Sequence, residues 1–266
     1  MLDYFTVNDL GNLSTTGVFV NRIYLPLLRE HLSGKVKLVL DVGCGTKPLR
    51  RVTGAFEGVT HVGVDIYPGK NVDVVFDGER IPFKEASFDL VLYNSVLEHT
   101  RNPAALIGDI RRVLRKGGRV LGSVPFANHI HAAPYDFWWP TYWGLNLLFE
   151  GFSAKRVYAT TSFVGFLANA VTARIILTIQ SVGKRLYGGG SRADTRGGSS
   201  PEYNSLDAMA RRSILARLAK FLLIDYNIAV MLIGLAGFVV DSFIFDRKKS
   251  GGNGELTPAY VFSMVK

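Results

Sequence analysis

The stretch that decides the fold is Val39-Leu40-Asp41-Val42-Gly43-Cys44-Gly45-Thr46. It continues an apolar run, Val36 to Leu40 with one lysine inside, that is typical of a short buried strand. Two glycines one residue apart let the backbone turn sharply and approach a ligand closely. In open α/β sheets, ligands bind at the carboxyl ends of strands. The stretch therefore predicts the first strand-to-helix turn of a doubly wound sheet and the floor of a nucleoside-type cofactor site.

The composition allows one large α/β domain with an elaboration. The chain has 266 residues, of which 48% are hydrophobic and 20% charged, and its formal net charge is +9. A basic balance favours nucleic acid, anionic lipid or phosphorylated substrates without choosing among them. The single cysteine excludes an intramolecular disulfide. Because no basic segment precedes an apolar run at the N-terminus, we expect no secretory signal and a cytoplasmic location.

Predicted strands and helices alternate along the chain. A helix is expected at 18–32 and a short one at 48–55, on either side of the first strand. The spacing of apolar residues predicts another helix that starts after Asn102 and runs to Arg115. The further predicted strands are 60–64, 72–77, 87–94, 119–124, 152–159 and 259–266. Such alternation with short links favours a parallel sheet covered on both faces.

Polar side chains stand at three successive predicted strand ends, Asp65, Asp77 and Asn94. Asp65 lies about 20 residues beyond the glycine turn, the offset at which an acid meets ribose hydroxyls in dinucleotide folds. Because the carboxyl ends of parallel strands meet at one edge, all three should face the same crevice as Gly43 and Gly45.

An ordered series of motifs runs through residues 37–124: Leu40–Thr46, Val62–Asp65, Asp77 with Ile81–Phe83, Ser87–Val91, Val96–His99 and Arg112–Gly118. This series is far more specific than a lone Gly-x-Gly, and it resembles the class I S-adenosylmethionine-dependent methyltransferases. The subgroup is similar to small bacterial methyltransferases of glycan, lipid or cell-envelope biosynthesis. The resemblance covers about residues 35–160 and the last few residues, and it is weak or absent over 165–255.

The resemblance implies S-adenosylmethionine as the cofactor. It places Gly43 and Gly45 under the methionine and ribose, Asp65 at the ribose diol and Asp77 at the adenine amino group. Ile66, Ile81 or Phe83 would supply apolar neighbours for the adenine. Ordinary turn glycines and solvated strand ends are the structural alternatives. The predicted cofactor-binding residues are Asp41, Gly43, Cys44, Gly45, Asp65, Ile66, Asp77, Gly78 and Asn94.

The predicted catalytic residues are His99, His131 and Asp136. Methyl transfer is an in-line displacement in which alignment supplies much of the rate. A hydroxyl acceptor also loses a proton, so a base with a pKa near neutrality helps. The alternatives are a helix cap for His99 and a structural corner for residues 129–136. A zinc site of His99, His129 and His131 lacks a persuasive ligand set, so no metal is predicted.

Three interpretations are open for the aromatic residues of 137–143: they line an acceptor pocket, fill the core, or form a membrane-facing edge. Related sequences tend to carry an arginine where this chain has Trp139. That departure puts an anionic-acceptor contact at Trp139 in doubt.

The predicted domain comprises residues 1–160 plus 256–266, with a helical, apolar insertion at 161–255. The insertion contains apolar stretches at 163–182 and 228–240, separated by a Gly/Ser-rich linker at 188–200. The uncharged run between Asp225 and Asp241 is shorter than the roughly 18–20 residues of a membrane span. The alternatives for this segment are a helical hairpin buried on the domain or at a dimer contact, an interfacial membrane attachment, and a lid near the cleft.

The sequence thus predicts an α/β, doubly wound Rossmann-like fold, with a mostly parallel seven-stranded sheet and a reversed last strand. The expected activity is O-methylation of a glycan, lipid-linked or cell-envelope small molecule. The alternatives are methylation of a quinone-like or other lipid ring, and a non-catalytic cofactor-binding partner protein. Nucleic acid is not expected as a partner, because no aromatic-basic groove is evident. A homodimer and a peripheral contact with the inner face of a membrane stay open.

Overall fold

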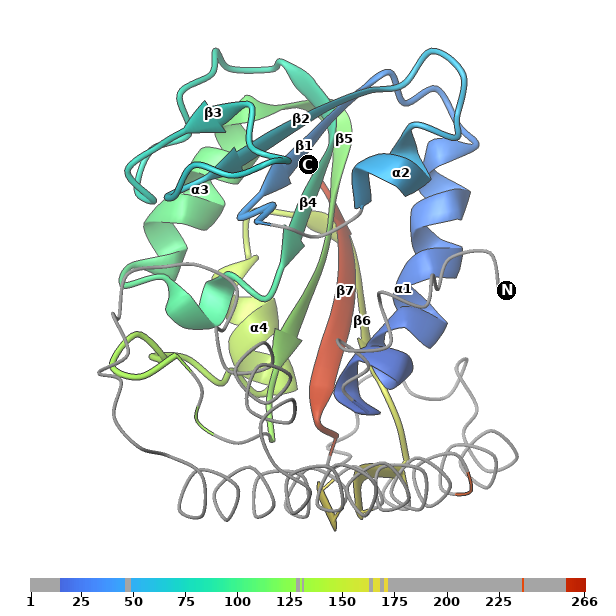
Figure 1. Cartoon of the computed structure of the whole chain (residues 1–266), viewed down its shortest axis with the longest axis vertical. Coiled ribbons are helices and arrows are strands. Elements are labelled where there is room, and N and C mark those ends of the chain that lie inside the picture. Colours follow the sequence, from blue (N-terminus) through green and yellow to red (C-terminus); the bar gives the residue numbers. More distant parts are fainter. Residues whose placement is uncertain are drawn as a thin grey trace, which may run out of the picture.

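The computed structural model describes residues 15–45, 49–127, 130, 132–162, 165–167, 170–171, 236 and 257–266. These residues form a seven-stranded sheet with helices on both faces (Figure 1). The strands are β1 (Leu38–Val42), β2 (Thr60–Asp65), β3 (Val74–Val75), β4 (Phe88–Asn94), β5 (Leu114–Pro125), β6 (Ser153–Ala159) and β7 (Ala259–Val265). The helices are α1 (Thr15–Leu32), α2 (Leu49–Thr53), the 3₁₀ helix η2 (Leu97–His99), α3 (Pro103–Val113) and α4 (Tyr142–Leu148).

The strand order is β3-β2-β1-β4-β5-β7-β6. Strands β1 to β5 pair in parallel, whereas β7 runs antiparallel to both of its neighbours, β5 and β6. The last strand of the chain is therefore inserted between β5 and β6. This topology confirms the predicted mostly parallel sheet with a reversed last strand.

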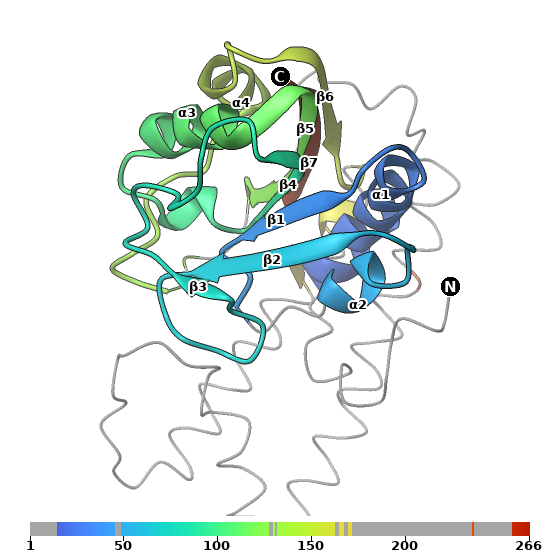
Figure 2. The ribbon, with the colours of Figure 1, turned by 90° about the horizontal axis from the view of Figure 1, so that it is seen from above.

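Two apolar layers hold the helices on the sheet. Helices α1 and α2 cover one face, and α3 and α4 cover the other (Figures 1 and 2). Leu27 and Leu28 of α1 are buried against Val39 and Leu92 of the sheet. On the opposite face, the buried residues Leu106 and Ile110 of α3, Leu145 of α4 and Phe262 of β7 belong to one cluster. Both faces are thus closed, as expected for a mostly parallel sheet.

Several element boundaries differ from the predicted ones. Strand β1 extends to Val42, two residues beyond the predicted end, and β3 is reduced to Val74–Val75. Helix α3 ends at Val113 instead of Arg115, because Leu114 is already extended and pairs with Phe88. Helix α4 was not predicted. Its N-cap is Thr141, whose hydroxyl oxygen accepts a hydrogen bond from the amide of Gly144 at 3.1 Å.

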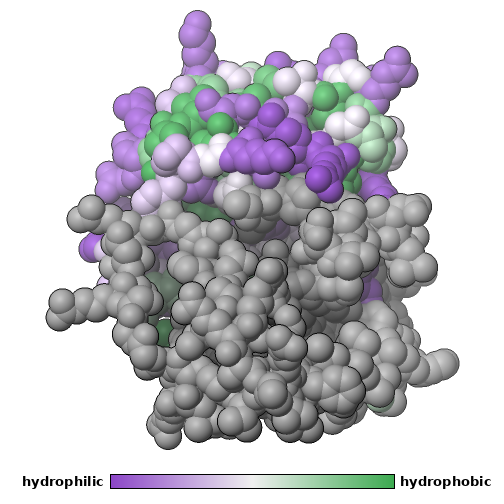
Figure 3. All heavy atoms as spheres, in the orientation of Figure 1, coloured by the Kyte–Doolittle hydropathy of each residue, from purple (hydrophilic) through white to green (hydrophobic). Residues whose placement is uncertain are grey.

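The predicted insertion at 161–255 lies almost wholly outside the described residues, so its alternatives stay predictions. Within the part of the chain that the structure describes, no helix is long and apolar enough to cross a membrane. At the upper end of the sheet, the described surface mixes hydrophilic and hydrophobic side chains, and neither kind fills that face (Figure 3).

Candidate active site

The glycine turn after β1 is closed by main-chain hydrogen bonds to β2. The amides of Gly43 and Cys44 both donate to the carbonyl oxygen of Val64, at 2.8 and 3.1 Å. Gly43 and Gly45 have positive φ angles of 66° and 45°. A Cβ on Gly43 would lie 2.3 Å from Cγ2 of Val96, the residue just before η2. A side chain at position 43 would collide with Val96, so glycine lets the turn lie against the start of η2.

Asp65 joins this turn to the end of β2. Its Oδ2 accepts a hydrogen bond from the amide of Gly45 at 2.8 Å, and its Oδ1 accepts one from Tyr67 at 3.2 Å. The side chain is half-buried, at the carboxyl edge of the parallel strands. The structure therefore brings Gly43, Gly45 and Asp65 together, as the strand-end pattern predicted. A carboxylate oriented in this way can also accept hydrogen bonds from a diol.

Ile66, which follows Asp65, lies next to the turn at Asp77 and Gly78. Ile66 is 49% exposed, and a Cβ on Gly78 would lie 3.0 Å from its Cγ2. The Oδ1 of Asp77 accepts hydrogen bonds from the amides of Glu79 and Arg80, at 2.8 and 2.9 Å. These amides hold the pKa of Asp77 below its ordinary value.

Ile81 and Phe83, the other expected neighbours of an adenine, pack inward. Ile81 is 1% exposed, and Phe83 meets the buried Phe88 edge to face at 5.1 Å. Ile66 is thus the exposed apolar side chain of the three.

Asp41, in β1, and Cys44, inside the glycine turn, are both buried. Asp41 is buried, with its Oδ2 at 3.6 Å from Nε2 of His61. Burial lowers the pKa of His61 to about 4, so the imidazole is neutral at pH 7 and this contact is not an ion pair. Burial raises the pKa of Cys44 to about 12, and its thiol donates to the carbonyl oxygen of Asn71 at 3.3 Å. Cys44 thus joins the turn to Asn71, in the segment between β2 and β3.

The side chain of Asn94 is turned toward α1. Its Nδ2 donates to the hydroxyl oxygen of Tyr24 at 2.7 Å, and its Oδ1 accepts from the hydroxyl of Ser123 at 3.1 Å. Asn94 therefore fixes the end of β4 against α1 and β5. A ligand beyond this strand end would meet its backbone. Tyr24 was not identified from sequence, since 70 residues separate it from Asn94.

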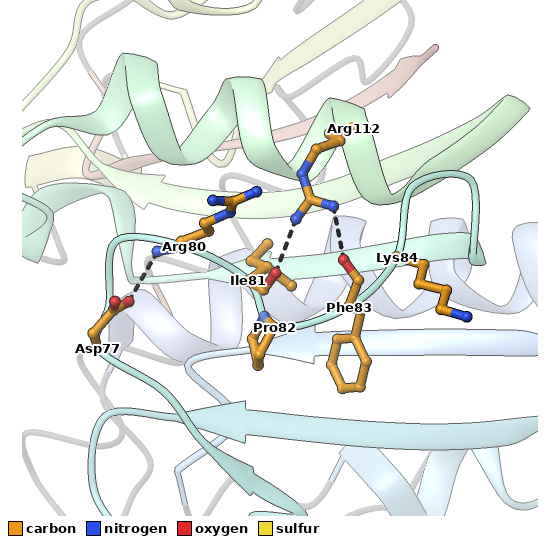
Figure 4. A pocket seen from close by; sticks show the side chains of 7 residues that line it. All are labelled: Asp77, Arg80, Ile81, Pro82, Phe83, Lys84 and Arg112. Atoms are coloured by element: carbon orange, nitrogen blue, oxygen red, sulfur yellow. Dashed lines mark hydrogen bonds between the residues drawn. The ribbon is translucent and has the colours of Figure 1, made fainter.

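A shallow, open hollow lies beside Asp77 on the loop before β4 (Figure 4). Arg112 of α3 holds this loop, because its two terminal nitrogens donate to the carbonyl oxygens of Ile81 and Phe83, at 2.9 and 2.7 Å. The hollow is lined by Asp77, one of the predicted cofactor-binding residues, and by Ile81 and Phe83, two of the expected adenine neighbours. Its lining is Asp77, Arg80, Ile81, Pro82, Phe83, Lys84 and Arg112.

The loop at 132–140 is docked on η2, directly after the end of β4. The carbonyl oxygen of Glu98 accepts hydrogen bonds from the amides of Phe137 and Trp138, at 2.7 and 3.3 Å. The indole nitrogen of Trp138 donates to the carbonyl oxygen of Thr100 at 2.8 Å. No sequence signal pointed to this docking, because its partners are 38 residues apart.

The same docking orients His99. Its Nδ1 lies 2.7 Å from the carbonyl oxygen of Tyr135. Because a carbonyl only accepts, Nδ1 carries a proton, and in the neutral ring Nε2 holds the lone pair. Nε2 is 3.8 Å from Oε1 of the buried Glu98, a carboxyl group that would stabilise a protonated ring. His99 thus has the tautomer and the neighbour of a general base.

Asp136 belongs to the docked loop next to His99's partner Tyr135. Its Oδ1 accepts a hydrogen bond from the indole nitrogen of Trp139 at 2.9 Å. The structure therefore places two of the three predicted catalytic residues, His99 and Asp136, at one junction. The third, His131, lies outside the described residues, as does His129.

A family model described as "Methyltransferase domain" matches residues 19–153, slightly more than half of the chain. The chain therefore belongs to this family of methyltransferase domains. The class predicted from the sequence, the class I S-adenosylmethionine-dependent methyltransferases, is confirmed.

Two curated relatives have named activities. The chain is 33% identical over 98 residues to the malonyl-[acyl-carrier protein] O-methyltransferase of Hahella chejuensis, covering 32% of this chain and 35% of the relative. It is 30% identical over 118 residues to the ubiquinone biosynthesis O-methyltransferase of Nitrosococcus oceani, covering 39% and 50%. The chain thus spans half or less of the length of the curated relatives it matches.

Among the solved structures that align over nearly the whole chain is an S-adenosylmethionine-dependent methyltransferase from Archaeoglobus fulgidus, with a TM-score of 0.50 and 15% identity, covering 99% of this chain and 100% of that one. At this identity the likeness concerns the fold alone, and it agrees with the strand order described above.

Proposed function

We propose that this protein is an S-adenosylmethionine-dependent O-methyltransferase acting on a glycan, lipid-linked or other small cell-envelope acceptor. The observation that carries the donor half is the junction of Gly45 and Asp65, at the carboxyl edge of β1 and β2. A glycine turn and a half-buried carboxylate there form a cradle for a ribose that offers two hydroxyl donors. Oxygen as the accepting atom is supported by two relatives that are themselves named O-methyltransferases.

S-adenosylmethionine, when bound, supplies an electrophilic methyl group on a sulfonium. The chain's own residues then have three tasks. Gly43 and Gly45 admit the backbone close to the ligand, and Asp65 accepts hydrogen bonds from the ribose. His99, with its Nε2 lone pair, takes the proton that the acceptor hydroxyl loses. The loop at 132–140 holds His99 and borders the space for the acceptor.

A quinone-like ring is the second candidate acceptor. It is favoured by the likeness to the ubiquinone biosynthesis O-methyltransferase and by the exposed aromatic side chains beside η2, among them Tyr135 and Trp138. Offset stacking on such side chains would suit a planar ring. We place either reaction at the inner face of a membrane, since both acceptors are lipid-borne or membrane-proximal.

The test offers the purified full chain S-adenosylmethionine with a labelled methyl group and three additions: a lipid-linked glycan fraction, a dihydroxylated quinone precursor, and buffer. We expect release of S-adenosylhomocysteine with the glycan fraction, and label recovered as a methyl ether. Label in the ring precursor instead would favour the second candidate. Tight cofactor binding without turnover on any of these acceptors would contradict both and favour a non-catalytic binding protein.

A further inference from the structure

The connection between β5 and β6 exposes an unusual set of side chains. Trp143 and Leu147 are one helical turn apart on α4 and are 74% and 70% exposed. On the opposite side of α4, Leu145 is fully buried in the core. Helix α4 therefore has a buried side and an exposed apolar side, and on the latter the ring of Tyr142 meets that of Trp143 edge to face at 5.1 Å.

The aromatic character continues into the docked loop. Tyr135, Phe137 and Trp138 are also exposed, although all three are large and apolar. All three tryptophans of the chain, at 138, 139 and 143, lie in this one connection. Tryptophan and tyrosine are enriched where a protein meets the membrane–water interface, because their amphipathic rings sit at the level of the lipid headgroups.

Cations flank this surface. Lys155 donates from Nζ to the carbonyl oxygen of Asn146 in α4 at 3.0 Å, and Arg111 donates from Nε to Gly151 at 2.9 Å, just beyond the helix. The guanidinium carbon of Arg101 lies 5.6 Å from the ring centre of Phe137. Of the nearby carboxylates, Asp136 accepts a hydrogen bond from Trp139, and Glu150 is exposed at the end of α4. The flanking charge thus favours an anionic partner.

We propose that Tyr135, Phe137, Trp138, Trp143 and Leu147 form a docking surface for an anionic lipid bilayer, called the aromatic surface below. Apolar and aromatic side chains enter the headgroup region, and the flanking cations face the lipid phosphates. The surface adjoins η2, so a docked bilayer presents a lipid-borne acceptor beside His99. Only this last point rests on the proposed methyltransferase function. The docking itself stands on exposure and charge.

The tryptophans of the aromatic surface allow lipid contact to be followed by their fluorescence. The full chain is mixed with vesicles of phosphatidylcholine alone, or of phosphatidylcholine and phosphatidylglycerol in equal parts. With the anionic vesicles we expect co-sedimentation, a shift of tryptophan emission to shorter wavelength, and quenching by lipids brominated in the acyl chains. With neutral vesicles we expect a much weaker response.

A double variant and a matched control localise the contact. Trp143→Ala with Leu147→Ser should weaken partitioning into anionic vesicles about tenfold or more, because two apolar side chains no longer leave water. Val75→Ser removes another exposed apolar side chain, 52% exposed on β3 at the opposite sheet edge, and should leave partitioning unchanged.

Three results would overturn the proposal. The first is an absence of binding to anionic vesicles. The second is co-sedimentation with unchanged tryptophan emission, which would assign lipid binding to another segment. The third is an emission shift that follows protein concentration without lipid, which would make the surface a contact between two copies. Calorimetry with S-adenosylmethionine, run in parallel without vesicles, reports separately whether the proposed function fails.

Discussion

The two sides of the predicted crevice are built in different ways. The donor side, formed by residues 43–45, 65–66 and 77–78, depends on glycine conformations and on main-chain hydrogen bonds near the strand ends. The acceptor side, formed by η2 and residues 132–148, depends on contacts such as that between Trp138 and Thr100, 38 residues apart. The donor side can therefore be recognised from local sequence, whereas the acceptor side exists only once the chain has folded.

The largest effect is expected at the glycine turn of the donor side. Gly43→Ala combines a positive φ with a Cβ 2.3 Å from Val96 Cγ2, so the free energy of unfolding should fall by about 2–4 kcal/mol. Binding of S-adenosylmethionine should become undetectable. Urea unfolding and calorimetry measure the two effects.

Gly58→Ala is the control for this variant. Gly58 has a similar φ of 74°, but an added Cβ there meets nothing within 4 Å. We expect a loss of about 1–2 kcal/mol from backbone strain alone and unchanged cofactor binding. Equal losses in the two variants, or normal binding by Gly43→Ala, would contradict the close approach of the turn to Val96.

On the acceptor side the expected effect is kinetic. His99→Gln should lower the rate of methyl transfer about 100-fold, because the proton acceptor is lost. The dissociation constant of S-adenosylmethionine should change by less than about twofold, because His99 lies outside the donor side. Asp136→Asn keeps a side-chain oxygen that accepts the hydrogen bond from Trp139, and it is measured alongside His99→Gln. A weaker affinity of His99→Gln for the cofactor would contradict the separation of the donor side from the acceptor side.

The smallest effect concerns His61 of β2, whose imidazole lies beside the buried Asp41. Burial lowers the pKa of His61 to about 4, so the unfolded chain binds more protons than the folded one between about pH 6.5 and pH 4. Stability should therefore fall as the pH drops through this window, by on the order of 2 kcal/mol for His61. His31, whose pKa burial also lowers to about 4, acts in the same direction.

Replacement of His61 separates its contribution from that of His31. His61→Asn places an amide near the hydroxyl of Thr53, which lies 2.9 Å from the imidazole Nδ1. The loss of stability between pH 6.5 and pH 4 should be smaller in this variant than in the wild type. Urea unfolding at a series of pH values measures it, and parallel curves for the two proteins would contradict the neutral, buried imidazole.

The limits of the sequence prediction follow the same division. The sheet was predictable because its strands contain short apolar runs, and two of them, β2 and β4, end in Asp65 and Asn94 as expected. Helix α4 was missed although Thr141 is a good N-cap, because its residues looked like part of an aromatic cluster. The orientation of Asn94 toward Tyr24, and of His99 toward Tyr135, depends on partners distant in sequence. No periodicity encodes such contacts.

Asp65, at the end of β2, is the residue that we propose holds the methyl donor. Calorimetric titration of S-adenosylmethionine into the wild type, Asp65→Ala and Asp89→Ala tests it most directly. Asp89 is the matched carboxylate at the opposite end of the sheet, where it accepts hydrogen bonds from the amides of Lys37 and Leu38. We predict about 100-fold weaker binding for Asp65→Ala, from the loss of charge-assisted hydrogen bonds, and unchanged binding for Asp89→Ala. Wild-type affinity in folded Asp65→Ala would contradict the account.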